Sequence, residues 1–207
     1  MSTVAPPSAM TEARATAKET ASLGMWVFLA SEMLFFGIVL FVYAISRMHA
    51  HEGFATASAR TDVWLGTLNT ALLLSSSCAI AIAAEAAACG RLQTSRRGLW
   101  IAVALGLAFV VIKGIEYHRE WAEGLVPGPG FTLHVPGAEL FFAWYFFATA
   151  LHAVHLLIGM AFCAGFALRR ELAADGTRMH ALALYWHFVD AVWIFLYPLI
   201  YLISPRS

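Results

Sequence analysis

Seven ionisable side chains lie in stretches of the sequence that are otherwise apolar, and they are the first candidates for chemistry. They are Glu32, Lys113, Glu116, His152, His155, His187 and Asp190. A charged side chain is costly inside hydrocarbon, so such residues face protein or water rather than lipid. Each of them is therefore a functional hypothesis.

Two pairs among these residues have helical spacing. His187 and Asp190 are three residues apart in YWHFVDAVWIFL (residues 185–196), and Lys113 and Glu116 have the same spacing. Residues i and i+3 are neighbours on one helix face. The spacing favours a structural pair, with His187 donating to Asp190, over a proton-handling or ligand site. It also predicts an intrahelical ion pair between Lys113 and Glu116 near the membrane surface.

The composition is that of a membrane protein. The chain has 207 residues, of which 60% are hydrophobic and 13% charged, whereas soluble domains have about 45–50% apolar and about 25% charged residues. The formal net charge is zero, so nothing predicts a nucleic-acid partner. Cys78, Cys89 and Cys163 have no Cys-x-x-Cys or Cys/His spacing, so neither a disulfide framework nor a metal site is indicated.

Five apolar stretches are long enough to cross a membrane. They cover about residues 23–46, 63–88, 98–117, 139–168 and 182–203. The first alone spans roughly 36 Å as a helix. We therefore expect an all-α polytopic membrane protein with one five-helix domain, residues 23–203, without internal repeats. A polar, frayed N-terminal tail (1–22) and a short C-terminal tail (204–207) complete it.

Charge and small residues add two expectations about the helices. The second stretch is rich in glycine, alanine and serine, which lets helices approach closely, so we expect it to be an interior helix. The N-terminal side carries eight Lys and Arg residues in its tail and loops, and the other side carries five, of which Lys113 is intramembrane. The positive-inside rule then places the N-terminus in the cytoplasm and the C-terminus outside.

The residues alone leave three function classes open. In a redox or metal protein, His152, His155 and His187 would be ligands, but a His-x-x-His pair is a weak signal and haem or haem–copper centres need histidines facing each other across helices. In a transporter, Glu32 would be a proton relay, although no inverted repeat or broken span is visible. A non-catalytic subunit of a larger membrane complex fits the small size and the small-residue faces.

Four sets of segments together resemble subunit III of the haem–copper respiratory oxidases, in its five-helix bacterial form. They are residues 24–32 (GMWVFLASE) with 35–37 (FFG), 68–76 (LNTALLLSS), 113–117 (KGIEY) with 147–155 (FATALHAVH), and 185–190 (YWHFVD) with 192–193 (VW) and 195–196 (FL). They cover about residues 23–203 in the family's order. The family's larger form has two more N-terminal helices, which this sequence lacks, and alanines flank His152 here where relatives often have glycine.

The resemblance implies a bundle split by a V-shaped cleft filled with structural phospholipids. It implies a non-catalytic subunit that packs on catalytic subunit I, with subunit II and, where present, a small subunit IV. Subunit I reduces oxygen to water and pumps protons with its own haem and copper, so this chain would bind no redox cofactor. The family's buried carboxylate corresponds to Glu32, which we expect to be neutral or hydrogen-bonded to His152 or His155, in support of proton uptake and catalytic life.

The remaining expectations concern lipid, location and alternatives. We expect lipid contacts at amphipathic aromatic and basic residues. These are Trp26, Arg47, His51, Trp64, Trp186 and Trp193. The expected location is the bacterial inner membrane, with cytochrome c, a fused cytochrome domain or quinol as electron donor to another subunit. An accessory subunit of a nitric oxide reductase and a small proton-coupled transporter are the alternatives.

Overall fold

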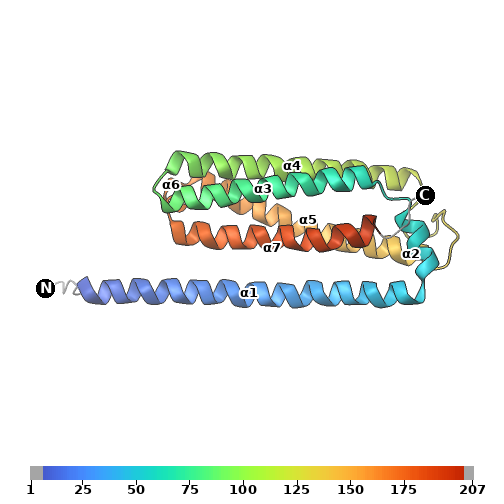
Figure 1. Cartoon of the computed structure of the whole chain (residues 1–207), viewed down its shortest axis with the longest axis horizontal. Coiled ribbons are helices and arrows are strands. Elements are labelled where there is room, and N and C mark those ends of the chain that lie inside the picture. The colour runs from blue at the N-terminus through green and yellow to red at the C-terminus, as the bar shows by residue number, and fades with distance from the viewer. Residues whose placement is uncertain (1–6, 203–207) are drawn as a thin grey trace.

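The computed structural model describes residues 7–202, and this part of the chain forms helices joined by short connections (Figure 1). The helices are α1 (Pro7–His49), α2 (His51–Ser58), α3 (Val63–Ala88), α4 (Leu92–Ala122), α5 (Ala138–Leu168), α6 (Arg170–Ala173) and α7 (Gly176–Tyr201). Five of them are long and apolar enough to cross a membrane, α1 through its segment Ser22–His49. The prediction of an all-α protein with five membrane-spanning helices is confirmed.

The helices extend beyond the predicted spans at their polar ends. Helix α1 begins at Pro7, so residues 7–22 are helical rather than the frayed tail that we expected. Their alanine, glutamate, lysine and arginine residues are good helix formers. Residues 1–6 and 203–207, which include the predicted C-terminal tail, lie outside the described residues. Two short helices, α2 and α6, were not predicted.

Two of the membrane helices begin at aspartate caps. The Asp62 carboxylate accepts hydrogen bonds from the backbone N–H groups of Trp64 and Leu65 at the start of α3. Asp175 does the same for the first turn of α7. Such caps satisfy backbone donors that have no partner within the helix. They set where each helix leaves its loop.

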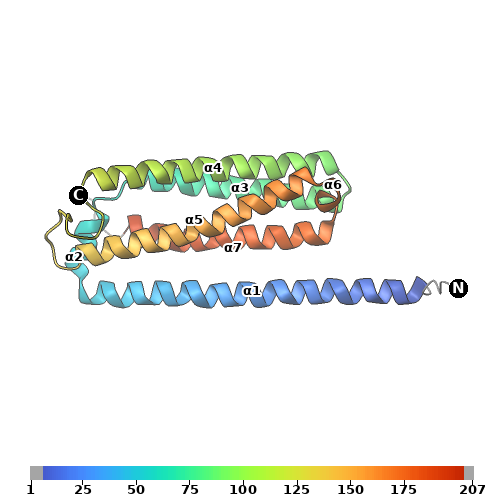
Figure 2. The same cartoon turned by 180° about the vertical axis from the view of Figure 1, so that it is seen from behind.

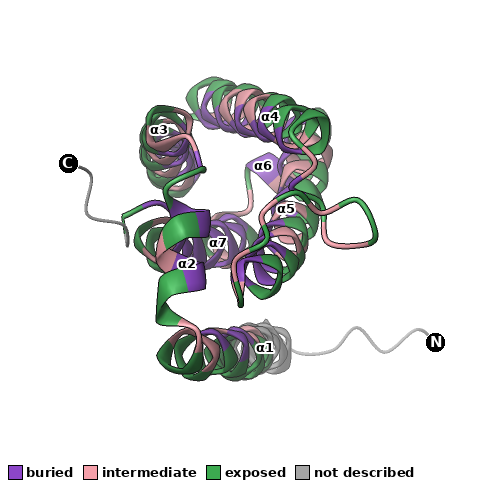
Figure 3. Ribbon diagram, turned by 90° about the vertical axis from the view of Figure 1, so that its right-hand side faces the viewer, coloured by how far each residue is buried: buried purple, intermediate pink, exposed green. Residues whose placement is uncertain are grey.

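Helices α3, α4, α5 and α7 surround a common core, and α1 lies outside them along α7 and α5 (Figures 2 and 3). In the most apolar 18-residue window of each helix, 56% of the residues are buried for α7, 39% for α3 and 17% for α1. Helix α7 is therefore the most enclosed of the spans, more so than α3, which we expected in the interior. Helix α1 is peripheral.

Small residues bring α3 and α4 together. A Cβ atom added at Gly98 would lie 2.8 Å from the Ala79 carbonyl oxygen and 2.9 Å from the Ala83 Cβ atom. Both distances are shorter than a normal van der Waals contact. The glycine therefore permits a backbone approach that a side chain would prevent, as expected for packing between membrane helices.

Candidate functional site: a carboxylate–histidine pair in an apolar groove

Glu32 on α1 and His155 on α5 form a side-chain polar contact between these two helices. The Glu32 Oε2 atom lies 3.2 Å from His155 Nε2, and the side chains are 21% and 14% exposed. His155 Nδ1 lies 2.9 Å from the Leu151 carbonyl oxygen. A carbonyl can only accept, so Nδ1 must donate.

The tautomer of His155 determines how the pair holds its proton. With hydrogen on Nδ1, a neutral His155 offers Nε2 only as an acceptor. Glu32 must then be a carboxylic acid that donates to Nε2, or else His155 is an imidazolium that donates to a carboxylate. In both cases one proton is shared between the two side chains. This arrangement suits proton handling.

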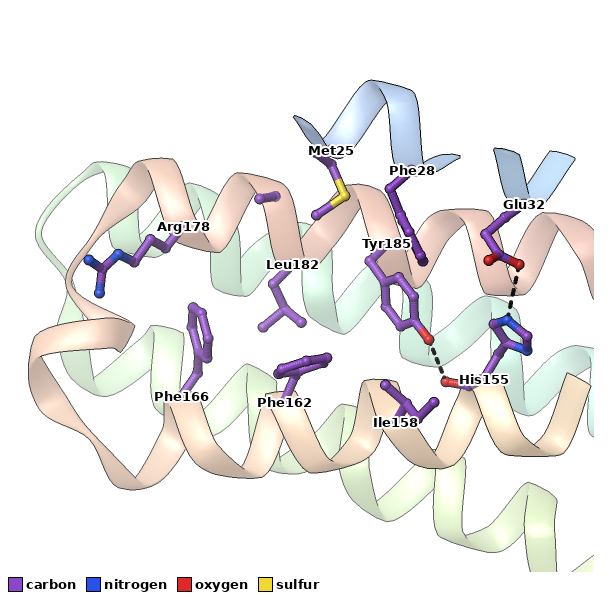
Figure 4. Close-up of a pocket in the computed structure, with 11 residues that line it drawn as sticks. Met25, Phe28, Glu32, His155, Ile158, Phe162, Phe166, Arg178, Leu182 and Tyr185 are labelled. Carbon is purple, nitrogen blue, oxygen red and sulfur yellow. Dashed lines mark hydrogen bonds and ion pairs between the residues drawn. The ribbon is translucent and has the colours of Figure 1, made fainter. Parts of the chain in front are cut away.

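The pair lies at one end of an apolar groove between α1, α5 and α7, with a volume of about 590 Å³ (Figure 4). The groove is lined by Met25, Phe28, Glu32, His155, Ile158, Phe162, Phe166, Arg178, Ala181, Leu182 and Tyr185. Arg178 lies at the end opposite to the pair, and Tyr185 donates a hydrogen bond of 2.9 Å to the His155 carbonyl oxygen. The groove thus has apolar walls, a cation at one end and the proton-sharing pair at the other.

His152 lies in a different environment from His155. It is fully buried in the bundle, with ring centroids 5.6 Å from Phe109 and 5.1 Å from Trp193. Neither of its ring nitrogens has a hydrogen-bond partner among the described residues. Residues i and i+3 differ by roughly 60° around a helix. That step turns His155 towards α1 and the groove and leaves His152 in the core, so only His155 joins Glu32.

The predicted hydrogen bond between His187 and Asp190 is wrong. His187 Nδ1 is hydrogen-bonded to the Ser77 hydroxyl on α3 at 2.7 Å. Asp190 is buried, and neither carboxyl oxygen has a hydrogen bond of standard geometry to the described residues, although Ser77 lies close enough to interact. His187 and Asp190 are three residues apart, so their side chains also differ by roughly 60° around the helix. His187 lines a second groove between α3 and α7, whereas Asp190 points inwards beside Cys163.

The ion pair between Lys113 and Glu116 is present, but protein encloses it. The Lys113 Nζ atom lies 2.9 Å from Glu116 Oε2, and the side chains are only 6% and 3% exposed. Lys113 also donates to the hydroxyls of Tyr145 on α5 and Tyr201 on α7, at 2.9 and 3.0 Å. The Tyr201 hydroxyl interacts in turn with Glu116 Oε1 at 2.6 Å. Spacing on α4 predicted the pair, but it gave no sign of these tyrosines or of buried Glu120 nearby.

The predicted lipid contacts are of two kinds. Trp186 and Trp193 are 0% and 1% exposed, and their Nε1 groups donate to Ser76 and Thr70 inside the bundle, so the prediction of lipid contact is wrong for these two. Trp26 and Trp64 are exposed.

Arg47 and His51 line a further groove beside α1, of about 470 Å³, together with Tyr43 and Leu199. The V-shaped, lipid-filled cleft that the resemblance implied stays a prediction. Among the described residues, no group of three or more His, Cys, Asp and Glu side chains is placed to hold a metal ion.

Comparisons with known proteins agree on one family. The family described as cytochrome c oxidase subunit III matches residues 9–204. A cytochrome c oxidase subunit 3 from Thermostichus vulcanus is 30% identical over 187 residues, which cover 88% of this chain and 87% of the relative. The cytochrome bo(3) ubiquinol oxidase subunit 3 from Pseudomonas aeruginosa is 28% identical over 185 residues, covering 87% and 84%.

A longer relative matches as well. The cytochrome c oxidase subunit 3 from Drosophila melanogaster is 31% identical over 195 residues, covering 86% of this chain and 67% of the relative. The match with the family reaches through all five apolar helices. The chain is a membrane protein that belongs to the cytochrome c oxidase subunit III family.

Proposed function

We propose that this chain is the non-catalytic subunit III of a proton-pumping haem–copper terminal oxidase in aerobic respiration. The relatives are named as subunits of cytochrome c oxidase and of ubiquinol oxidase, which supports an oxidase complex with either type of donor. In this proposal, subunit I reduces oxygen to water with haem and copper, subunit II and, where present, a small subunit IV accompany it, and this chain carries no redox centre. Its role is to stabilise subunit I and to support proton uptake.

The contact between Glu32 Oε2 and His155 Nε2, at 3.2 Å, is the observation that carries the proposed role in proton uptake. Glu32 is ten residues from Ser22, where the apolar segment of α1 begins. That distance is about 15 Å of helix, half the thickness of the hydrocarbon layer. With the N-terminus in the cytoplasm of a bacterial inner membrane, the groove would connect the pair to the cytoplasmic side, from which protons are taken up.

The groove would hold a structural phospholipid. Its apolar walls, which include Phe28, Phe162 and Phe166, suit acyl chains. Arg178 at the other end is a guanidinium whose Nε lies 3.3 Å from Asp175, and its remaining N–H donors can bind a phosphate oxygen pair. An Arg178→Gln variant should therefore retain less phospholipid after purification, whereas Arg170→Gln, on the connecting α6, should retain the wild-type amount. Equal retention in both variants would remove the lipid proposal and leave the subunit assignment untouched.

The subunit assignment is tested by purifying the tagged chain in mild detergent, with a visible spectrum and a subunit gel. A larger subunit and haem absorbance should accompany the chain, and the haem should stay with that subunit on separation. A complex that reduces nitric oxide rather than oxygen would favour the nitric oxide reductase alternative. A chain that runs alone and colourless would favour a proton-coupled transporter. If it runs alone and coloured, its histidines are ligands and the proposal is wrong.

The proton role is tested with Glu32→Gln in the same complex. The amide keeps the shape of the side chain but cannot exchange a proton with His155, so the oxidase should assemble normally and inactivate after severalfold fewer turnovers. Glu85→Gln, on the exposed face of α3, is the matched control and should behave as wild type. An unchanged turnover lifetime in Glu32→Gln would exclude the pair from this role.

A further inference from the structure

Lys113, Glu116 and Glu120 form a buried row on one face of α4. Their spacings are three and four residues, and each is at most 5% exposed. The row lies in the C-terminal third of α4, where Lys113 contacts both α5 and α7. It contains two carboxyl groups but one ammonium group.

The ammonium group of Lys113 has no donor left for Glu120. A lysine has three N–H donors. They are used by Glu116 at 2.9 Å, by the Tyr145 hydroxyl at 2.9 Å and by the Tyr201 hydroxyl at 3.0 Å. The second oxygen of Glu116 accepts from Tyr201 at 2.6 Å. Lys113 and Glu116 are therefore a complete ion pair with both carboxylate oxygens satisfied.

Glu120 is buried next to this ion pair without a cation of its own. Neither of its oxygens is accessible or has a hydrogen bond of standard geometry to the described residues, although the Tyr145 hydroxyl is close enough to interact. The titratable groups that face it are Lys113, Glu116 and Tyr117 on α4, Glu123 just beyond α4, Tyr145 on α5 and Tyr201 on α7. An ionised Glu120 would leave the buried cluster with one uncompensated negative charge, which is costly in a low-dielectric interior.

We propose that Glu120 is a proton-binding site, a neutral carboxylic acid beside a Lys113–Glu116 ion pair. The bound proton brings the net charge of the cluster to zero and turns Glu120 into a donor as well as an acceptor. Glu123 is exposed at the end of α4, so the aqueous phase at that end is where the proton can exchange. This site goes beyond the proposed function and does not depend on it, because it rests on the interior of this chain alone.

Infrared difference spectroscopy tests the site directly. The protein is purified from its own membranes with the chains that accompany it, and the spectrum of Glu120→Gln is subtracted from that of the wild type at neutral pH. We expect a carbonyl-stretch band of a protonated carboxyl group that shifts in D2O. The matched control is Glu123→Gln, which removes an exposed glutamate at the end of α4 and should leave no such band. If the Glu120→Gln difference also lacks the band, the proposal is overturned.

Accumulation in the membrane provides the second test. Glutamine has the shape and neutrality of a protonated glutamate, so Glu120→Gln should accumulate at the wild-type level. Glu116→Gln removes the carboxylate that accepts directly from Lys113 and Tyr201, and should accumulate severalfold less. If Glu120→Gln accumulates as poorly as Glu116→Gln, the native carboxyl is ionised and the proposal is wrong.

Discussion

Replacement of Lys113 by methionine should destabilise the helix bundle by about 3–5 kcal/mol, the range found when one partner of a buried ion pair is removed. Lys113 donates to Glu116 and to two tyrosine hydroxyls from α5 and α7, so three helices lose a shared contact. Methionine fills most of the same volume but cannot balance the carboxylate. Glu116 must then stay charged without a counterion or take up a proton.

A double variant separates the charge effect from packing. Lys113→Met combined with Glu116→Leu removes both charges together, and replacing a buried ion pair by apolar residues of similar volume is often neutral or stabilising. The double variant should therefore recover at least half of the stability lost by Lys113→Met. Unfolding of the purified protein in mixed detergent micelles, followed by circular dichroism, gives the free energies.

The matched control lies on the same helix. Arg119 and Asp62 also form an ion pair, at 3.5 Å, but the side chains are 59% and 40% exposed. Exposed pairs contribute about 0–1 kcal/mol, so Arg119→Met should change the free energy of unfolding by no more than that. If Lys113→Met were as mild as Arg119→Met, the pair would not stabilise the bundle and the reasoning would fail.

The same unfolding measurement checks two further predictions. Gly98→Ala should cost about 1–3 kcal/mol, as overpacking does, because the new methyl group meets the α3 backbone. Gly114→Ala should be neutral or slightly stabilising, because no atom outside the backbone of its own helix lies within 4 Å of the added Cβ. Equal effects of the two would contradict the close approach of α3 and α4. Trp186→Phe loses the hydrogen bond to Ser76 and should cost about 1–3 kcal/mol, whereas Trp64→Phe, at an 83% exposed position, should stay within about 0.5 kcal/mol.

Hydropathy predicted the five membrane helices because each contains a long apolar window, but it misplaced some of their ends. Helix α4 runs from Leu92 to Ala122, beyond the predicted 98–117 at both ends. A backbone helix does not stop where hydrocarbon stops. Its first turns before residue 98 carry Gln93, Arg96 and Arg97, which are compatible with a helix in water. Hydropathy measures the membrane-embedded part alone and so underestimates helix length.

A shared helix was not sufficient to predict a contact: the spacing of His187 and Asp190 predicted a hydrogen bond that is absent, whereas the contact of Glu32 with His155 across two helices was expected from the resemblance. The spacing of Lys113 and Glu116 sufficed for their ion pair. Ser77, the partner of His187, is 110 residues away along the chain, and no local pattern connects them. The helical period could have corrected the prediction that Trp186 and Trp193 contact lipid. Both share a helix face with Asp190, and because a carboxyl group faces protein rather than lipid, both rings can be expected to point into the bundle.

The position of α1 links the groove to the proton-sharing pair. Near its C-terminal end, α1 is hydrogen-bonded to the bundle at two places. The Tyr43 hydroxyl donates to the Leu199 carbonyl on α7, and Trp144 on α5 donates to the Val39 carbonyl. Further towards the N-terminus, Met25 and Phe28 form one wall of the groove. Glu32 lies on α1 between these hydrogen-bonded residues and the groove wall formed by Met25 and Phe28. Glu32 and His155 both line this groove, so a molecule that fills it would act on the distance between them. Lipid occupancy and proton sharing should accordingly be coupled, and a change that widens the groove should weaken the pair even though it leaves both residues in place.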